Sequence, residues 1–167
     1  VMAQHPLVVD MGVSGSGKST IGALVAAALG VPFVDGDSLH PVSNIAKMAA
    51  ATPLTDEDRW PWLATIGEAL AAAESTGLVV ACSALKRRYR DAILRGDPST
   101  VFLHLDGSRE VLSSRLEGRS DHFMPTSLLD SQLDDLERLE PDEPGCVVDI
   151  GAPVADVVAA AVDDLRR

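Results

Sequence analysis

Aromatic residues and cysteines are scarce in this sequence. Only 4% of the 167 residues are Phe, Trp or Tyr, whereas 46% are hydrophobic, which predicts a core built mainly from Val, Leu, Ile and Ala. The two cysteines, Cys82 and Cys146, lie in separate apolar runs and do not have the spacing of metal ligands. We therefore expect two reduced core thiols rather than a disulfide or a metal centre, which favours the cytosol.

Basic residues are also few. The chain has 14 Lys and Arg against 25 Asp and Glu, which is a formal net charge of -11 at pH 7. Affinity for duplex nucleic acid comes largely from Lys and Arg that neutralise phosphates. This charge balance therefore argues against nucleic acid as a partner, and any anionic ligand must be bound by a local basic cluster.

Long hydrophobic runs are absent. No run approaches the roughly 18 apolar residues that a membrane span requires. The first residues also do not have the charged and apolar regions of a signal peptide. We therefore expect no membrane partner and a cytoplasmic location.

Most of the chain consists of short apolar runs that alternate with helical patterns. The apolar runs predict five strands of a parallel sheet buried on both faces, at 7–11, 32–35, 78–82, 101–105 and 146–150. Helices are expected at about 18–29, 40–50, 56–75, 85–95, 108–118, 125–139 and 154–166. The predicted fold class is α/β, with one domain over 1–167 and a five-stranded parallel sheet flanked by helices. Ligands of such sheets bind at the carboxyl ends of the strands.

The stretch "GVSGSGKS" at residues 12–19 matches the pattern G-x-x-x-x-G-K-[ST]. It follows a predicted strand and opens a predicted helix, which is the context that defines a P-loop. In a P-loop, backbone N–H groups and the lysine bind phosphates, and the Ser or Thr hydroxyl can ligate Mg²⁺. The sequence thus predicts a site for a nucleoside triphosphate, with ATP and Mg²⁺ as the expected cofactors.

Carboxylates follow the second predicted strand in "VDGD", where Asp35 and Asp37 are separated by one residue. If this strand lies near the first, one carboxylate could hold the metal and the other could accept a substrate proton. A solvated Asp-Gly turn is the alternative. Asp106, at the end of "VFLHLD", also has the pattern of a Walker B aspartate and could bind the magnesium ion in place of Asp35.

A basic set follows the third strand in "CSALKRRYRD", which contains Lys86, Arg87, Arg88 and Arg90. On an acidic protein such clustering suits an anionic substrate, although a solvated helix face is the alternative. Two further stretches, 35–62 and 118–125, are unusually polar for plain crossovers and are where functional residues are expected. Trp60 and Trp62, in the stretch 35–62, either line a substrate pocket or anchor this stretch to the core.

The order of these motifs resembles that of the gluconokinases, a family of small P-loop kinases related to shikimate and adenylate kinases. The resemblance runs through nearly the whole chain and rests on "MGVSGSGKS" at 11–19, "DGDSLHP" at 35–41, "NIAKM" at 44–48, "PLTDEDRWPWL" at 53–63, "CSALKRRYRD" at 82–91, "RLEGRSDHF" at 115–123, "LLDSQLDDLE" at 128–137 and "VVDI" at 147–150. It implies a nucleoside-monophosphate-kinase-like fold with an acceptor-binding insertion at about 36–75 and a lid at about 116–127. It also implies a homodimer.

The resemblance further implies transfer of the γ-phosphoryl group of ATP to the 6-hydroxyl of D-gluconate. Catalysis would then fall to Lys18, to Asp37 as the base for the acceptor hydroxyl, and to Arg119 in the lid. Magnesium would be held by Ser19 and Asp35. The nucleotide would be bound by Gly12, Val13, Ser14, Gly15, Ser16, Gly17, Lys18, Ser19 and Thr20, with Arg115 and Pro153 on either side of adenine. The acceptor would be bound by Asp37, His40, Arg59, Lys86 and Arg90.

Other functions remain open at this point. A kinase for shikimate or a nucleoside monophosphate would show ADP release that depends on that acceptor instead. A P-loop regulator would hydrolyse nucleotide slowly without any acceptor. The paired aspartates, the basic helix and the lid arginine favour phosphoryl transfer, because a kinase must keep water away from the reacting phosphoryl group. His122 and Phe123 could contact the acceptor but fit simple packing equally well.

Overall fold

Within residues 5–117 and 126–167, the part of the chain that the computed structural model describes, five parallel strands form one sheet. The strand order is β2-β3-β1-β4-β5. The strands are β1 (Leu7–Met11), β2 (Phe33–Asp35), β3 (Leu78–Ala81), β4 (Val101–Asp106) and β5 (Gly145–Asp149). The predicted fold class is confirmed, and the central position of β1 puts the loop that follows it between its neighbours β3 and β4.

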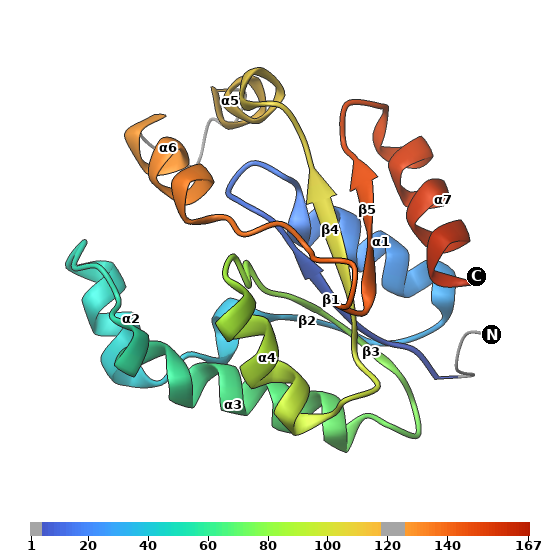
Figure 1. Ribbon diagram of the computed structural model, residues 1–167, viewed down its shortest axis with the longest axis horizontal. Helices are drawn as coiled ribbons and strands as arrows, with labels where there is room; N and C mark the ends of the chain where they lie inside the picture. The colour runs from blue at the N-terminus through green and yellow to red at the C-terminus, as the bar shows by residue number, and fades with distance from the viewer. Residues whose placement is uncertain (1–4, 118–125) are drawn as a thin grey trace.

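Helices cover both faces of this sheet and extend beyond its carboxyl edge (Figure 1). The helices α1 and α7 pack on one face, and α3 and α4 pack together on the other. The helices α5 and α6 lie past the carboxyl ends of the strands, and α2 lies farther out. Their bounds are α1 (Lys18–Leu29), α2 (Val42–Ala49), α3 (Asp56–Ala72), α4 (Arg87–Gly96), α5 (Arg109–Glu117), α6 (Thr126–Asp135) and α7 (Val154–Leu165).

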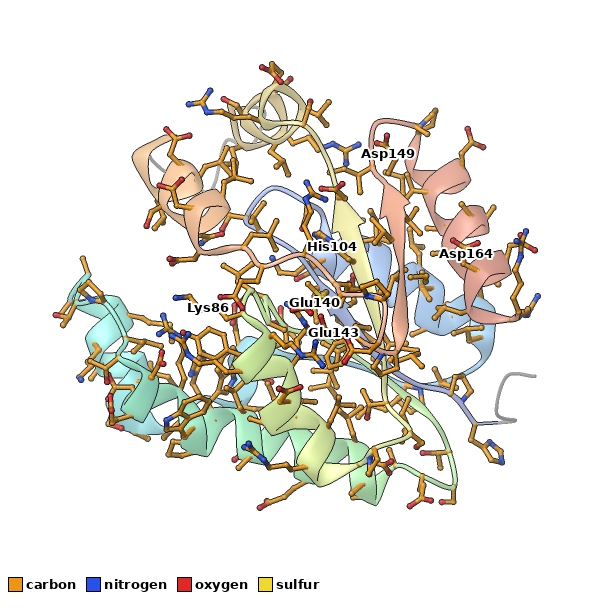
Figure 2. All side chains as sticks on the ribbon, viewed as in Figure 1. Lys86, His104, Glu140, Glu143, Asp149 and Asp164 are labelled. Carbon is orange, nitrogen blue, oxygen red and sulfur yellow. The ribbon has the colours of Figure 1, made fainter. Side chains whose placement is uncertain are left out.

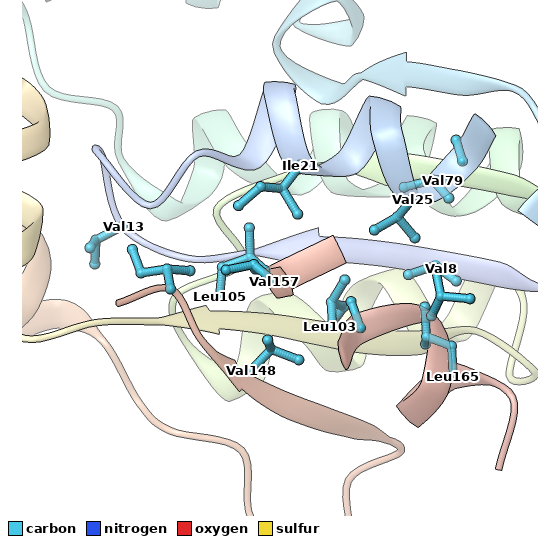
Figure 3. Packing of buried hydrophobic residues seen from close by; sticks show 14 of the residues in the cluster. Val8, Val13, Ile21, Val25, Val79, Leu103, Leu105, Val148, Val157 and Leu165 are labelled. Atoms are coloured by element: carbon cyan, nitrogen blue, oxygen red, sulfur yellow. The ribbon is translucent and has the colours of Figure 1, made fainter. Parts of the chain in front are cut away.

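Alternate residues of β1 face two separate hydrophobic clusters, as expected from the period-two geometry of a strand. Val8 belongs to the cluster that contains Ile21 and Val25 of α1 and Val157 and Leu165 of α7 (Figure 3). Val9 faces the opposite cluster, which is formed with α3 and α4. Both clusters are rich in Val, Leu and Ile, as the composition predicts.

The prediction that the strands are buried on both faces is confirmed for the central strands and is wrong for the edge strands β2 and β5. Every residue of β1 and β3 is buried, and so are the four inner residues of β4. In β5 only Val148 is buried, and β2 is half-buried throughout. Edge strands have a neighbour on one side only, so their apolar residues do not require full burial.

Between β2 and β3 the chain forms a 3₁₀ turn, η1 (Gly36–Leu39), and then α2 and α3. The helix α3 begins with a capping box, in which the Thr55 hydroxyl accepts from the Asp58 N–H and the Asp58 carboxylate accepts from the Thr55 N–H. The buried Trp62 indole N–H donates to the Gly36 carbonyl at 2.8 Å. Trp62 thus anchors η1 to α3. Of the two predicted roles, anchoring the stretch to the core and lining a substrate pocket, this contact favours the first for Trp62. Trp60 is 36% exposed and meets the Tyr89 ring edge-on, so it does not belong to the core.

The helix predicted at 125–139 is shorter in the structure, where α6 ends at Asp135. The backbone leaves the helix because the Glu137 N–H donates to the Leu85 carbonyl at 2.7 Å, in the turn between β3 and α4. Leu136 and Leu139 pack against the α3–α4 cluster. Tertiary contacts therefore override a helical sequence pattern here.

Both cysteines are free thiols; Cys82 is buried in the core as predicted, whereas Cys146 is only partly buried. Burial raises the pKa of Cys82 to about 12 and that of Cys146 to about 11, so both are protonated at neutral pH. In the described part of the chain, no helix has the length and apolar character needed to cross a membrane.

Candidate active site

The loop between β1 and α1 has the backbone of a phosphate cradle. Gly15 and Gly17 have φ angles of 85° and 86°, in the left-handed region that favours glycine. Gly17 is also the N-cap of α1, and no side chain within the described residues caps this helix end. The first N–H groups of α1 are therefore available to an anion, and the helix dipole adds partial positive charge. The Lys18 ammonium donates to the Val13 carbonyl at 3.2 Å, which folds it back over the loop.

A polar cavity of about 160 Å³ lies beside this loop, and three strands contribute to it through the segments at their carboxyl ends. Its lining residues are Ser14, Lys18, Ser19, Asp35, Asp37, Ala81, Cys82, Ser83 and Gln132. The sheet order explains the grouping, because β3 lies between β1 and β2. The topology thus brings Lys18, Ser19 and the two aspartates together, as the sequence motifs require.

Asp35 is held by two hydrogen bonds at the end of β2. Its Oδ2 accepts from the Ser19 hydroxyl at 3.1 Å, and its Oδ1 accepts from the Asp37 N–H at 3.0 Å. A hydroxyl and a carboxylate at the mouth of a P-loop fit a magnesium ion whose remaining ligands are phosphate oxygens and water. In the described residues no group of three or more His, Cys, Asp or Glu could hold a metal.

Asp37 differs from Asp35 in its surroundings. Its side chain is 82% exposed, and its Oδ1 lies 4.0 Å from the Nε2 atom of His40. A carboxylate that lines the phosphate cavity and faces solvent can meet the hydroxyl of an incoming substrate. Asp37 therefore has the access that an acceptor-side base needs.

His40 is buried and firmly held. Its ring stacks on Trp62 with centroids 4.1 Å apart and an interplanar angle of 15°. The Asn44 amide nitrogen donates to the Asp58 carbonyl at 2.8 Å and lies 3.1 Å from His40 Nδ1. Since the amide nitrogen is a donor, Nδ1 accepts and the ring proton sits on Nε2, facing Asp37. Burial lowers the pKa of His40, although the Asp37 charge opposes this shift, so the ring is neutral at pH 7.

Arg59 belongs to an ion-pair network between α3 and α4. It donates to the Tyr89 hydroxyl at 3.2 Å and contacts Asp56 at 3.5 Å, while Arg88 donates to Asp56 at 2.7 Å. Both guanidinium carbons lie 5.3 Å from the centre of the Tyr89 ring. The hydrogen bonds from Tyr89 and Arg88 lower the pKa of Asp56, which keeps the network charged. Arg59 is thus held partly exposed on the insertion, outside the lining of the phosphate cavity.

The structure does not bring Arg90 to the acceptor side, and this prediction is corrected. Its side chain is fully buried and forms two hydrogen bonds with the Glu143 carboxylate, at 2.6 and 3.1 Å. Glu143 lies beside α4, in the segment that joins α6 to β5 (Figure 2). Arg90 also donates to the carbonyls of Ala84 and Leu85, and Ala84 has a φ angle of 43°. The sequence pattern could not distinguish this structural guanidinium from a ligand-binding one.

Lys86 is the N-cap of α4 and is half-exposed, at the other end of the turn that Arg90 holds. It lies outside the lining of the phosphate cavity, like His40 and Arg59. Of the predicted acceptor residues, Asp37 alone lines that cavity within the described part of the chain.

Arg115 lies close to Gly17 of the P-loop, and Pro153 follows β5. Arg115, in the last turn of α5, donates to the Ile150 carbonyl just after β5. A Cβ built on Gly17 would come within 4.0 Å of the Arg115 guanidinium. Pro153 is the exposed N-cap of α7, three residues after Ile150. Of the predicted adenine-binding pair, Arg115 therefore lies beside Gly17 at the start of α1, and the roles of both residues stay predictions. Arg119, His122 and Phe123 lie outside the described residues, as does most of the predicted lid.

Asp106 is engaged elsewhere. Its Oδ2 accepts from the Arg138 guanidinium at 2.8 Å, and it does not line the phosphate cavity. Burial opposes ionisation of Asp106, but the hydrogen bond and charge of Arg138 outweigh it and hold its pKa below the usual range. The geometry therefore favours Asp35 over Asp106 as the metal-side carboxylate.

Sequence reasoning missed Ser83 and Gln132 as members of the site. Both belong to motifs that carry the resemblance, "CSALK" and "LLDSQLDDLE", so the signal was present without a role attached to it. Ser83 follows β3 and its carbonyl accepts from the Gly12 N–H at 3.3 Å. Gln132 comes from α6 and reaches the loop across 118 residues of sequence.

A P-loop with a metal-side carboxylate and a second, exposed carboxylate at the edge of this five-stranded sheet is the arrangement of the small P-loop kinases, and the chain has their fold. The sequence pattern of the shikimate kinase family matches residues 14–141. The thermosensitive gluconokinase of Escherichia coli (strain K12) is 49% identical over 151 residues, which cover 88% of this chain and 80% of that protein. The thermoresistant gluconokinase of the same strain is 43% identical over 98% of this chain and 95% of its own. The chain therefore belongs to the gluconokinase family.

A solved structure agrees with this assignment. The crystal structure of a gluconokinase from Sinorhizobium meliloti 1021 superimposes with a TM-score of 0.89 at 49% identity, covering 97% of this chain and 92% of that one. The likeness extends over the insertion as well as the sheet, because nearly the whole chain is covered.

Proposed function

We propose that this chain transfers the γ-phosphoryl group of ATP to the 6-hydroxyl of D-gluconate, which yields ADP and 6-phosphogluconate. The relatives that cover most of the chain are gluconokinases by name. The observation that carries the proposal is the position of Asp37, an exposed carboxylate in the same cavity as Lys18 and Ser19. A base beside the phosphate site and open to solvent suits transfer to a hydroxyl acceptor better than slow hydrolysis.

In this proposal the P-loop N–H groups and Lys18 bind the phosphates and offset the charge that spreads over the transferring group. Ser19 and Asp35 hold the magnesium ion, which neutralises phosphate charge when bound. Asp37 orients the 6-hydroxyl and accepts its proton. Arg119, from the lid, is the proposed donor to the transferring phosphoryl group.

The acceptor site is proposed on the insertion, next to Asp37. Gluconate is an anion at neutral pH, and it would approach a protein whose net charge is -11. Arg59 and Lys86 supply local positive charge on α3 and at the start of α4. His40, neutral with its proton on Nε2, is a donor beside Asp37. Arg90 is not included, since Glu143 and two carbonyls engage it. Arg115 and Pro153 are proposed to enclose adenine.

The assembly and location are further proposals. The family resemblance supports a homodimer, and the protonated, unpaired thiols support a cytoplasmic location. The acidic composition supports a protein without nucleic-acid partners. The proposed acceptor-binding insertion at about 36–75 corresponds to η1, α2 and α3.

The test is an assay of ADP release with a panel of acceptors at saturating MgATP. Gluconate should stimulate release far above the rate without acceptor, and shikimate and nucleoside monophosphates should not. Asp37→Asn should abolish the stimulation while leaving ATP binding nearly intact, with exposed Asp135→Asn as the matched control. Stimulation by shikimate instead, or the same slow release with every compound, would overturn the proposal.

A further inference from the structure

Gln132 reaches the P-loop from a helix that the motifs do not connect with it. Its Oε1 accepts a hydrogen bond from the Ser14 backbone N–H at 2.7 Å. It lines the same cavity as Lys18, Asp35 and Asp37. Ser14 is the third residue of the loop "GVSGSGKS", on the turn that surrounds the outer phosphates. The side chain thus stands where the nucleotide and the acceptor would meet.

The carboxamide of Gln132 has two chemically different ends. An N–H donor needs an acceptor, so the oxygen and not the nitrogen faces Ser14. This leaves Nε2, which has two N–H donors and no acceptor at hydrogen-bond distance within the described residues. The cavity is lined by two carboxylates, Asp35 and Asp37, which repel phosphate, so a neutral N–H donor in the same lining would stabilise a bound phosphate group. Lys18 supplies an ammonium group to the same lining.

Rigid packing holds Gln132 in this place. Leu129, one turn earlier on α6, is fully buried in the α1–α7 cluster, and Leu133 packs against the same cluster. Asp130 on α6 makes a two-point ion pair with Arg109 on α5, at 2.6 and 3.2 Å. The helix α6, which carries Gln132, is therefore anchored to the core and to α5.

We propose that Gln132 contacts the transferring phosphoryl group of the nucleotide. Its Oε1 holds the P-loop turn through the Ser14 N–H, and its Nε2 donates to an oxygen of the terminal phosphate. No proton is transferred, since an amide is neutral before and after. This inference rests on the proposed phosphoryl transfer, but it concerns the nucleotide end of the site and is independent of which acceptor is used.

The test compares nucleotides that differ only in the terminal phosphate. Gln132→Glu keeps an oxygen acceptor for Ser14 but loses the donor and adds a negative charge. We expect it to weaken binding of the non-hydrolysable analogue AMPPNP roughly 10- to 100-fold, the usual range for a hydrogen bond to a charged group, while ADP binding changes less than about 3-fold. With any acceptor that is turned over, kcat/KM for MgATP should fall by at least as much as AMPPNP affinity, and kcat should fall as well if the contact strengthens in the transition state.

Two further variants keep the test decisive. Gln132→Met has a similar shape without either polar end, and it should show the same selective loss if Gln132→Glu does not fold. Asp134→Asn, exposed on the same helix, should behave as the parent. Equal losses for ADP and AMPPNP, or a lower melting temperature with unchanged nucleotide affinities, would overturn the proposal in favour of a structural link between α6 and the loop. Absence of gluconate turnover in the parent, with selective AMPPNP binding intact, would contradict the proposed substrate and leave this contact supported.

Discussion

Asp10 is the most informative position for a stability test, because the core holds its carboxyl without a partner. It is fully buried in β1, and neither carboxyl oxygen has a hydrogen bond within the described residues. Gly22 of α1 lies directly over it, since a Cβ at that glycine would come within 2.4 Å of Asp10 Oδ2. Burial raises the pKa of Asp10 well above its usual value, and the Lys18 charge only partly offsets this. Burial therefore favours the neutral form of the Asp10 carboxyl.

The magnitude follows from proton linkage. The folded pKa is above the unfolded one, so between these values the unfolded chain has lost its proton while the folded protein retains it. The free energy of unfolding then falls as pH rises, by about 1.4 kcal/mol for each pH unit between the two pKa values. The contribution is fully present below the unfolded pKa and is lost as pH rises through the folded pKa. The unpaired polar atoms cost about 1–3 kcal/mol in addition, at any pH.

The assay is urea unfolding of the parent, Asp10→Asn and Asp10→Leu from pH 4.5 to 8. Asp10→Asn keeps the shape and removes the titration, so its stability relative to the parent should grow with pH. Asp10→Leu removes the polar atoms too and should be more stable than the parent by about 1–3 kcal/mol even at low pH, if the space below Gly22 accepts two methyl groups. Exposed Asp135→Asn should leave the profile unchanged. A constant difference between the parent and Asp10→Asn over this range would refute the reasoning.

Four other single substitutions and one double variant test the site and the core. Lys18→Ala should leave a folded protein with phosphoryl transfer nearly abolished, because its charge is aimed at phosphate oxygens; turnover within a few-fold of the parent would contradict the P-loop role. Asp35→Asn should lose activity that added Mg²⁺ partly restores. Asp37→Asn should lose activity roughly 10²- to 10⁴-fold at every Mg²⁺ concentration. A magnesium titration with saturating gluconate tests both expectations. Arg90→Met should lower the free energy of unfolding by about 3–5 kcal/mol, because Glu143 is left buried and unpaired. The double variant Arg90→Met/Glu143→Leu should recover much of this loss. A single variant as stable as the parent would contradict the buried ion pair.

The sequence alone determined the fold class and the phosphate end of the site. Apolar runs of five residues or fewer mark the strands, and Gly15, Gly17 and Lys18 lie in a pattern that has one well-understood backbone solution. Local chemistry is sufficient in these cases, because a parallel strand buried on both faces is mostly apolar and a tight phosphate loop needs glycine. The pair Asp35 and Asp37 was likewise placed correctly beside the loop, since parallel strands end at one edge.

Only the tertiary structure decided which polar side chains serve the site and which serve the core. Arg90 and Lys86 lie four residues apart in one basic motif, yet Arg90 is fully buried against Glu143 and Lys86 is half-exposed. Among the described residues the Asp10 carboxyl has no hydrogen-bond partner, and Gln132 accepts a hydrogen bond from a loop 118 residues away. A residue type shows which hydrogen bonds and charges a side chain can offer. Its partners, and therefore its role, depend on which distant segments the packing of α4, α6 and β1 brings within about 3 Å.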